Sequence, residues 1–309
     1  MAPQNQTRVM PYGPEAIAEA ARLILAGEPV AVPTETVYGL AADATREAAV
    51  ARIYEAKGRP SFNPLIVHVP SLAEAERIGI FSDTARRLAA EHWPGPLTLV
   101  VPLRPDAEIA ASVTAGLPTI ALRCPAHPAM RDLLTATGRP LAAPSANASG
   151  GISPTWAEHV LKTLGGRIAL IVDGGATRRG LESTIVKVEG EAVTLLRPGP
   201  LSIDAAAPSP GAVEAPGMLA SHYAPGKPLR LDATVVEPDE WFVGFGPIEG
   251  NDTLSASGDL EEAAARLFGA LHRADESERP RIAVAPVPAQ GIGAAINDRL
   301  RRAAAPKEV

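Results

Sequence analysis

The sequence predicts a two-domain α/β protein, with a mixed-sheet domain over residues 1–207, a connecting segment over 208–228 and a smaller domain over 229–309. Before residue 208, short runs rich in Val, Ile and Leu alternate with helical patterns, which indicates a sheet packed with helices. The segment 208–228 holds five prolines and three glycines, which exclude a helix or a central strand. After it, strand and helix patterns alternate again, so a small open α/β layer is expected.

The individual elements follow from apolar runs bounded by Pro or Gly and from helix-start signals. In the first domain we expect strands at 30–32, 65–69, 97–101, 119–123, 141–143, 168–172, 183–188 and 192–196. Helices are expected at 14–26, 45–56 (with Thr45 as N-cap), 83–92, 128–136 and 154–164, and a capping box at 71–74 leads a short helix. The second domain should have strands at 241–245 and 281–287 and helices at 260–273 and 292–304. Only Glu-Gly-Glu separates the last two strands of the first domain, so they should form an antiparallel hairpin and make that sheet mixed.

Composition excludes several classes of protein. The chain is 46% hydrophobic and 21% charged, which is ordinary for a globular protein. Its single cysteine, Cys124, rules out a disulfide framework and a cysteine-based zinc cluster. The first residues have no apolar leader core, and no stretch approaches the roughly 18 apolar residues of a membrane span, so we expect a cytoplasmic protein without membrane association. The net charge of −6 disfavours a purely electrostatic nucleic-acid binder.

A dense polar motif follows the helix expected at 45–56. Lys57 and Arg59 are followed by Asn63 and His68, and two prolines fix the turn between them. A rigid loop that bears Lys, Arg and Asn suits a polyphosphate, because Lys acts as a point charge and Arg as a bidentate donor. The alternative is that the two cations only complement the helix dipole and that His68 is a core residue.

Further polar clusters lie at expected strand ends, where α/β sheets place ligand contacts. The run 33–40 brings two threonines, a carboxylate and a tyrosine after a strand, and the run 144–153 supplies three serines and a Gly-Gly pair, the composition of an anion-binding nest. Arg123 ends an otherwise apolar strand, so it is either paired with a carboxylate or available to one. The alternative for the first run is a strand-end turn capped by its hydroxyls, and the alternative for the second is an ordinary loop, since Ser, Asn and Gly are common in loops.

Taken in order, these runs resemble one family, the YrdC-like L-threonylcarbamoyladenylate synthases in their longer, two-domain form. The runs are PTETVYGL (33–40), KGRPSFNPLIVHV (57–69), PGPLTLV (94–100), TIALRCP (119–125), APSANASGGISPT (143–155), ESTIV (182–186), LRPGP (196–200) and APGMLASHYAP (215–225). The similarity covers residues 14–228 and is looser beyond them. It implies a YrdC-like twisted mixed sheet with a ligand cleft, followed by a small Rossmann-like α/β domain.

The resemblance implies an enzyme, a nucleotidyltransferase that combines L-threonine, bicarbonate (or CO2) and ATP into L-threonylcarbamoyl-AMP and pyrophosphate. The product would feed a downstream transferase that makes threonylcarbamoyladenosine next to the anticodon of tRNA. Magnesium would enter with ATP and be held mainly by the phosphates, and no metal-ligand residue is implied. The segment 208–228 would then be a lid over the active site.

The same resemblance assigns roles to individual residues. Lys57 and Arg59 are expected to be catalytic, with Lys57 stabilising charge at the phosphates. ATP is expected to contact Arg59, Asn63, Thr119, Ser145, Ser153, Arg197 and Tyr223. Threonine is expected to contact Thr36, His68, Arg123, Ala143 and Ser183, with Arg123 pairing the substrate carboxylate.

Two rival functions are weighed against synthesis. A YrdC-like domain can be an RNA-binding module without synthase activity, with weak binding of tRNA or double-stranded RNA. The negative net charge and the lack of interleaved aromatic residues count against that alternative. The carbamoyltransferases of hydrogenase maturation share the domain, but they carry cysteine zinc fingers, which a chain with one cysteine does not.

Overall fold

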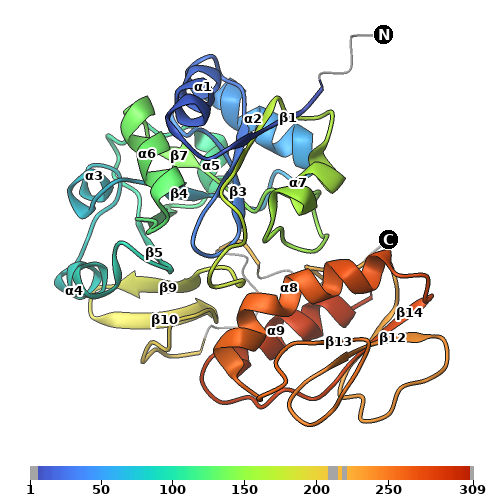
Figure 1. Ribbon diagram of the computed structural model, residues 1–309. Coiled ribbons are helices and arrows are strands. Elements are labelled where there is room, and N and C mark those ends of the chain that lie inside the picture. Colours follow the sequence, from blue (N-terminus) through green and yellow to red (C-terminus); the bar gives the residue numbers. More distant parts are fainter. Residues whose placement is uncertain (1–5, 208–214, 218–220, 307–309) are drawn as a thin grey trace.

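The computed structural model describes residues 6–207, 215–217 and 221–306, so 208–214 and 218–220 of the connecting segment lie outside the described residues (Figure 1). Within the described part, one mixed sheet has ten strands. Their order is β1 (Arg8–Pro11), β8 (Leu170–Asp173), β2 (Val30–Pro33), β3 (Tyr38–Asp43), β7 (Leu141–Ala142), β4 (Ile66–His68), β6 (Thr119–Arg123), β5 (Leu97–Pro102), β9 (Thr184–Glu189) and β10 (Ala192–Arg197). The expected hairpin is confirmed, because β9 and β10 pair in antiparallel fashion.

Helices cover one face of the large sheet but only part of the other. The covered face carries α2 (Glu47–Lys57), α3 (Leu72–Glu76), α4 (Asp83–His92), α5 (Ala111–Thr114) and α7 (Ala157–Leu164). On the opposite face, α1 (Pro14–Leu25) and α6 (Pro128–Thr137) pack over β2 and β8. The remainder of that face presents Ile66, Ala121 and Ile185, and Ala215 of the connecting segment packs on them. The helix layer therefore stops above β4, β6 and β9 and leaves room for a site.

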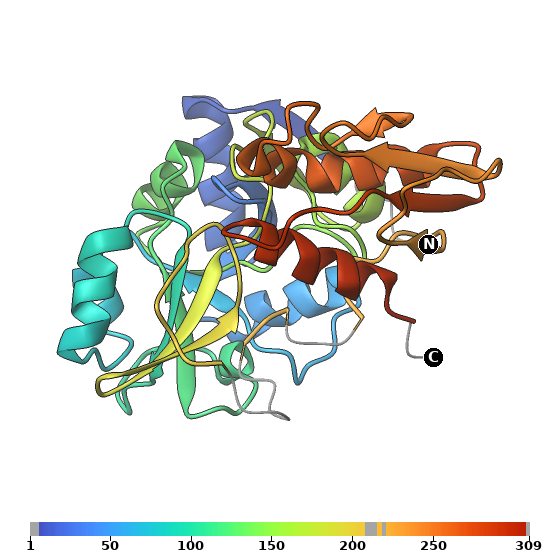
Figure 2. The same cartoon turned by 90° about the horizontal axis from the view of Figure 1, so that it is seen from below.

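A second sheet belongs to the C-terminal part. Its strands run in the order β11 (Leu229–Arg230), β14 (Arg281–Val284), β12 (Glu240–Gly244) and β13 (Asp252–Thr253), and all pair in parallel. Helices α8 (Leu260–Glu276) and α9 (Gly293–Ala304) lie between this sheet and the first part (Figures 1 and 2). Val37, Ile152 and Leu181 of the first part join the apolar core of the second, so the two parts pack tightly. The mixed α/β fold with a small parallel α/β unit is as predicted, whereas the domain boundaries at 208–228 stay a prediction.

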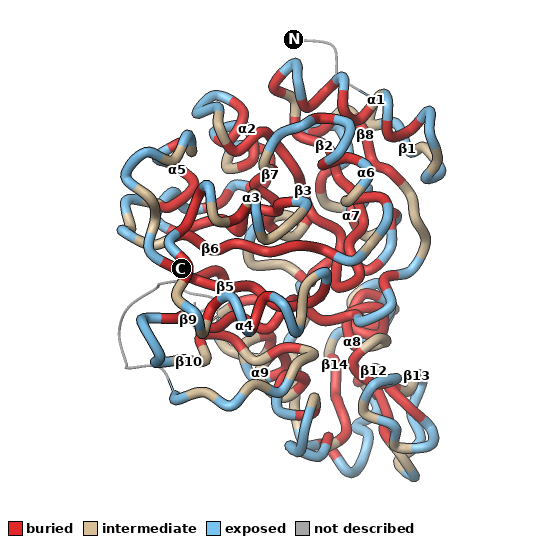
Figure 3. The backbone as a smooth tube through the Cα atoms, turned by 90° about the vertical axis from the view of Figure 1, so that its left-hand side faces the viewer, coloured by how far each residue is buried: buried red, intermediate tan, exposed pale blue. Residues whose placement is uncertain are grey.

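The structure corrects several predicted elements. Residues 38–43 form β3, every residue of which is buried (Figure 3), whereas no strand is predicted there from the sequence. Gly and Ala dominate this strand, and their low strand propensity conceals it. The N-cap predicted at Thr45 is wrong, because α2 begins at Glu47 and the Thr45 hydroxyl bonds the Asp43 carboxylate.

Helix α7 begins at Ala157 rather than at 154, because Pro154 still pairs with an extended strand: its carbonyl accepts a hydrogen bond from the Tyr38 amide. The short strands β1, β11 and β13 and the one-turn helix α5 were not predicted, since two to four residues carry too little periodicity to be recognised. Among the described residues, no helix is long and apolar enough to cross a membrane.

Candidate active site

A small cavity of about 50 Å³ lies on the part of the sheet face that the helices leave open. It brings together most of the predicted site residues with several others: Thr36, Val37, Arg59, Ile66, His68, Arg123, Ala143, Pro144, Ser145, Glu182, Ser183, Arg197, Pro216, Gly217, His222 and Tyr223. This volume holds a few water molecules at most. Lys57, Asn63, Ser153 and Thr119 do not line the cavity, and the first three of them contact residues of its wall or of the adjoining loops.

The pairing of β4 with β6 explains why His68 and Arg123 meet. The two strands are parallel, and His68 lies opposite Arg123 at their carboxyl ends. Side chains alternate along a strand, so Ala121 and Thr119 share the face of Arg123. Thr119 begins β6, four residues from Arg123, which is about 13 Å along a strand. It therefore lies on the expected face but beyond the cavity.

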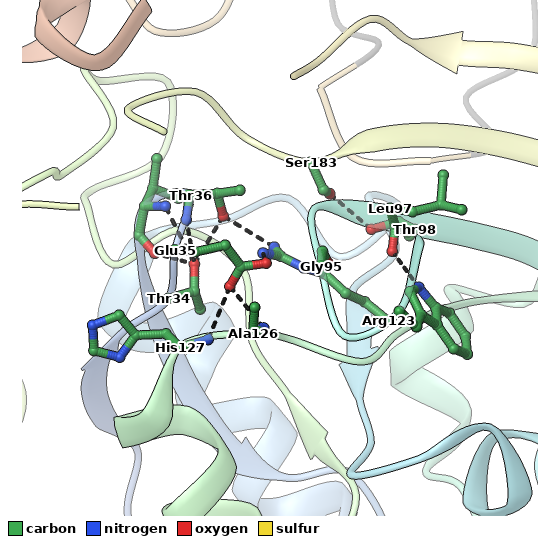
Figure 4. Close-up of polar contacts among 12 residues, drawn as sticks. Thr34, Glu35, Thr36, Gly95, Leu97, Thr98, Arg123, Ala126, His127 and Ser183 are labelled. Carbon is green, nitrogen blue, oxygen red and sulfur yellow. Dashed lines mark hydrogen bonds and ion pairs between the residues drawn. The ribbon is translucent and has the colours of Figure 1, made fainter. Parts of the chain in front are cut away.

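Arg123 is paired with a carboxylate within the protein. Its guanidinium donates to Glu35 Oε1 at 2.7 Å, to the Thr36 hydroxyl at 3.0 Å and to the Gly95 carbonyl at 3.3 Å (Figure 4). Burial alone would raise the pKa of Glu35, but the charge and hydrogen bond of Arg123 outweigh it and lower that pKa. The guanidinium has five N–H groups, and the other two donate no hydrogen bond to the described residues.

His68 is buried beside this ion pair without hydrogen-bond partners. It is 2% exposed, and neither ring nitrogen has a partner among the described residues. Burial, followed by the nearby charge of Arg123, lowers the pKa of His68 to about 3. The ring is therefore neutral at ordinary pH, and its unsatisfied nitrogens suit a polar group of a ligand. Across the cavity, the Ser183 and Thr98 hydroxyls are 2.7 Å apart (Figure 4).

Three other buried cations have no carboxylate partner among the described residues. The Lys57 ammonium donates to the carbonyls of Ser145 (2.6 Å) and Asn147 (2.5 Å). Arg59 donates to two carbonyls of its own turn at 3.2 and 3.0 Å, and Arg197 donates to the Ser183 carbonyl and hydroxyl at 3.0–3.1 Å. Burial lowers the pKa of all three side chains, that of Arg59 to about 10. Lys57 lies in the last turn of α2, as the helix-dipole alternative requires, but its ammonium also bonds a neighbouring loop, which that alternative does not predict.

The described residues of the connecting segment line one side of the cavity. The Tyr223 ring is 1% exposed, and its hydroxyl has no hydrogen-bond partner in the part of the chain that the structure describes. The next amide, of Ala224, donates to the Gly150 carbonyl at 2.8 Å, which joins the segment to the serine-rich loop. On the other side, the Pro216 carbonyl accepts a hydrogen bond from Arg197 at 3.3 Å.

Sequence reasoning missed two carboxylates of the site, Glu35 and Glu182. Both lie inside the motifs quoted for the resemblance, and the carboxylate of the run 33–40 was noted there, but neither glutamate was assigned a role in the site. Glu35 orients Arg123, and Glu182 lines the cavity and accepts a short hydrogen bond from the Ser153 hydroxyl. The signal that could have found Glu35 is Arg123 at the end of an apolar strand, which requires a buried partner; no local signal points to Glu182, whose partner Arg299 lies on α9.

The fold and the site define a YrdC-like α/β domain with a cation-rich cavity, joined to a smaller α/β unit. The Sua5, YciO and YrdC family model, described as telomere recombination, matches residues 22–199. The model described as the C-terminal domain of threonylcarbamoyl-AMP synthase matches residues 177–305. The chain belongs to the threonylcarbamoyl-AMP synthase family, in the two-domain form represented by Sua5.

Individual relatives are similar in sequence over more than nine-tenths of this chain. The threonylcarbamoyl-AMP synthase of Bacillus subtilis is 41% identical, over 93% of this chain and 92% of its own length. That of Pyrococcus abyssi is 38% identical, over 92% of each. The crystal structure of P. abyssi Sua5 complexed with L-threonine superposes with a TM-score of 0.86 at 36% identity, over 96% of this chain and 98% of that one. The protein is thus an enzyme of the nucleotidyltransferase type, as the sequence predicted.

Proposed function

We propose that the cavity converts L-threonine, bicarbonate (or CO2) and ATP into L-threonylcarbamoyl-AMP and pyrophosphate. The observation that carries this proposal is the buried positive charge of Lys57, Arg59 and Arg197, which has no carboxylate partner among the described residues. A polyphosphate supplies the missing negative charge, because buried cations need a compensating anion. The threonine amine would add to CO2 to give a carbamate, whose oxygen then attacks the α-phosphate as pyrophosphate leaves.

The proposed contacts divide the cavity between the two substrates. Threonine lies at Thr36, His68, Arg123, Ala143 and Ser183, and its carboxylate takes the free N–H groups of Arg123. ATP lies against Arg59, Asn63, Ser145, Ser153, Arg197 and Tyr223, with Thr119 beyond them along the sheet. Lys57 does not line the cavity but bonds the carbonyl of Ser145, which does, and contributes its positive charge from there. Acceleration then comes from positioning and charge stabilisation rather than from a covalent enzyme intermediate.

Magnesium is proposed to enter as the counter-ion of ATP. Among the described residues that line the cavity, Glu182 is the carboxylate, and its two oxygens already accept hydrogen bonds from Ser153 and Arg299. No group of three or more potential ligands for a metal ion occurs in the described residues. Both observations suit an ion held mainly by phosphates and water.

The connecting segment is proposed to be a lid. A cavity of about 50 Å³ cannot hold a nucleotide, so Tyr223 and its neighbours must move for ATP to enter. Residues 1–207 and 229–309 are then the two units that the lid joins. The product would pass, in the cytoplasm, to a transferase that modifies tRNA. Membership of the synthase family favours this function over an RNA-binding module.

Pyrophosphate release from ATP tests the proposal. Release should require both L-threonine and bicarbonate, and equal release without threonine would contradict the proposed reaction. Arg197→Met should abolish most of it, because a cation at the phosphates is removed. The matched control is Arg77→Met, since Arg77 is an exposed arginine with a surface ion pair to Glu74. Such pairs contribute little to stability, so this variant should keep wild-type activity.

A further inference from the structure

Arg299 is the largest fully buried side chain among the described residues, and it reaches from one part of the molecule into the other. It lies on α9, which packs with the small sheet. Its guanidinium nevertheless donates to Glu182 Oε2 at 2.8 Å and to the Pro198 carbonyl at 2.9 Å. Glu182 and Pro198 flank the hairpin β9–β10 of the large sheet, so Arg299 bonds directly to the wall of the cavity.

The same side chain contacts the connecting segment. The central guanidinium carbon of Arg299 lies 5.1 Å from the centre of the Tyr223 ring, within the range of a cation–π interaction. One residue earlier, the His222 amide donates to the Arg302 carbonyl of α9 at 3.2 Å. Helix α9 therefore holds the segment both through its backbone and through Arg299.

The charge of Arg299 also matters to an anionic ligand. Glu182 lines the cavity, and a buried carboxylate there would repel phosphates, because buried charges are poorly screened by salt. Arg299 compensates that charge, while the second Glu182 oxygen accepts the hydrogen bond of Ser153. Removal of Arg299 would leave Glu182 unpaired next to the nucleotide.

We propose that Arg299 is a positioning residue for ATP: it neutralises Glu182 and holds the Tyr223 ring in place, so that the C-terminal part completes the nucleotide site without touching the nucleotide. The proposal rests on the proposed function, since it takes ATP as the ligand of this cavity. It gives the C-terminal part a role in catalysis beyond that of a tethered domain.

The test uses the full-length chain and steady-state pyrophosphate release. Arg299→Met should raise the KM for ATP at least tenfold and change the KM for threonine less than twofold. Arg299 also pairs with Asp298 at 2.7 Å, but Asp298 keeps its ion pair with Arg302 when Arg299 is removed. In Glu182→Gln/Arg299→Met no carboxylate is therefore left unpaired, so the KM for ATP should return to within about threefold of wild type. Arg299→Lys, which keeps the charge, should lie between Arg299→Met and wild type. Arg301→Met is the matched control, because Arg301 is exposed on the same helix.

Thermal unfolding of each variant separates positioning from folding. If Arg299→Met does not fold, the positioning role is tested with the other two variants. Glu182→Gln/Arg299→Met removes both charges of the ion pair, and Arg299→Lys keeps the positive charge. Equal rises in the KM for ATP and for threonine, or a KM for ATP that matches the Arg301→Met control, would overturn the positioning role. Absence of threonine-dependent release in the wild-type chain would instead refute the proposed function.

Discussion

The two ends of the cavity balance their buried cations differently. At one end, Arg123 lies 2.7 Å from the Glu35 carboxylate and also donates to a threonine hydroxyl. At the other end, Lys57 and Arg197 donate to backbone carbonyls and a serine hydroxyl, with no carboxylate partner among the described residues. Both ends are buried to a similar degree, so the difference lies in charge and not in exposure.

This difference indicates which ligand each end can take. The end with Glu35 and Arg123 is neutral overall, and neutral His68 lies beside it, which suits a zwitterion such as threonine. The end with Lys57 and Arg197 is positive, which suits a polyphosphate. Phosphate oxygens are stronger acceptors than the carbonyls that now accept hydrogen bonds from these cations. Replacing a carbonyl by a phosphate oxygen as the acceptor therefore favours binding.

Lys57→Met should have the largest effect, because it removes charge from the positive end while keeping the side-chain volume. Turnover should fall by about 10²–10³-fold, the usual loss for one charge-stabilising donor. Since Lys57 is 3% exposed, the partly buried Ser145 carbonyl and the buried Asn147 carbonyl also lose a donor, at a cost of about 1–3 kcal/mol of unfolding free energy. Pyrophosphate release and urea unfolding measure the two effects.

The control for Lys57→Met is Lys162→Met, because Lys162 lies on the surface in an ion pair with Glu276. It should keep both turnover and stability near wild type. Turnover of Lys57→Met at the wild-type level would show that the positive end does not act on the phosphates, and the comparison of the two ends would fail.

Glu35→Gln should disturb the neutral end instead. It leaves Arg123 buried without a counter-charge, which should lower the unfolding free energy by about 3 kcal/mol at pH 7. The KM for threonine should rise more than the KM for ATP. Because Arg123 lowers the pKa of Glu35 below its usual 4.5, the wild-type advantage is complete above pH 4.5 and is lost as pH falls through the lower folded-state pKa.

Urea unfolding of wild type and Glu35→Gln across this pH range checks the sign. The two curves of stability against pH should converge in acid. A difference that stays constant to the lowest accessible pH would show that hydrogen bonding, and not charge, accounts for the role of Glu35.

His68→Gln should have an intermediate effect, and the effect should be on how the unfolding free energy depends on pH. The pKa of His68 is about 3 in the folded chain against 6.5 ordinarily, so between these values the unfolded chain binds a proton that the folded chain does not. Stability should therefore fall as pH falls from 6.5, by up to about 1.4 kcal/mol per pH unit from this residue. The variant should show a shallower slope between pH 6.5 and 4 in urea unfolding, and an unchanged slope would contradict a neutral, buried His68.

Thr119→Val should have the smallest effect. It tests whether ATP, bound at the positive end, also contacts Thr119 at the start of β6. A neutral hydrogen bond contributes about 1 kcal/mol, so loss of an ATP contact would raise the KM for ATP by about fivefold at most. The kcat and the KM for threonine should stay unchanged. A larger loss would mean that Thr119 lies closer to the reacting phosphates than its place at the start of β6 indicates.

The large sheet was predictable where its strands are continuous apolar runs. The prediction 119–123 coincides with β6, and the hairpin of β9 and β10 has the predicted pairing. Buried strands are rich in Val, Ile and Leu, so composition alone reveals them. Strand β3 escaped because small residues carry little strand signal, although every one of its residues is buried.

The sequence predicted which loops and strand ends form the candidate site, but it did not predict which of their charged side chains form ion pairs. His68 and Arg123 were both singled out at strand ends, and parallel pairing brings those ends together. The partner of Arg123 lies 88 residues away, and the partner of Arg299 lies 117 residues away. No local pattern encodes such pairs.

The sequence alone determined the fold class, the synthase family and most residues of the cavity wall, because strand composition, turn residues and motif order are local properties of the chain. The tertiary structure alone decided which buried cations are balanced within the protein and which are left for a ligand. It also decided that the C-terminal part reaches the cavity through Arg299. The physical reason is that ion pairing depends on distances between side chains that only the folded chain brings together.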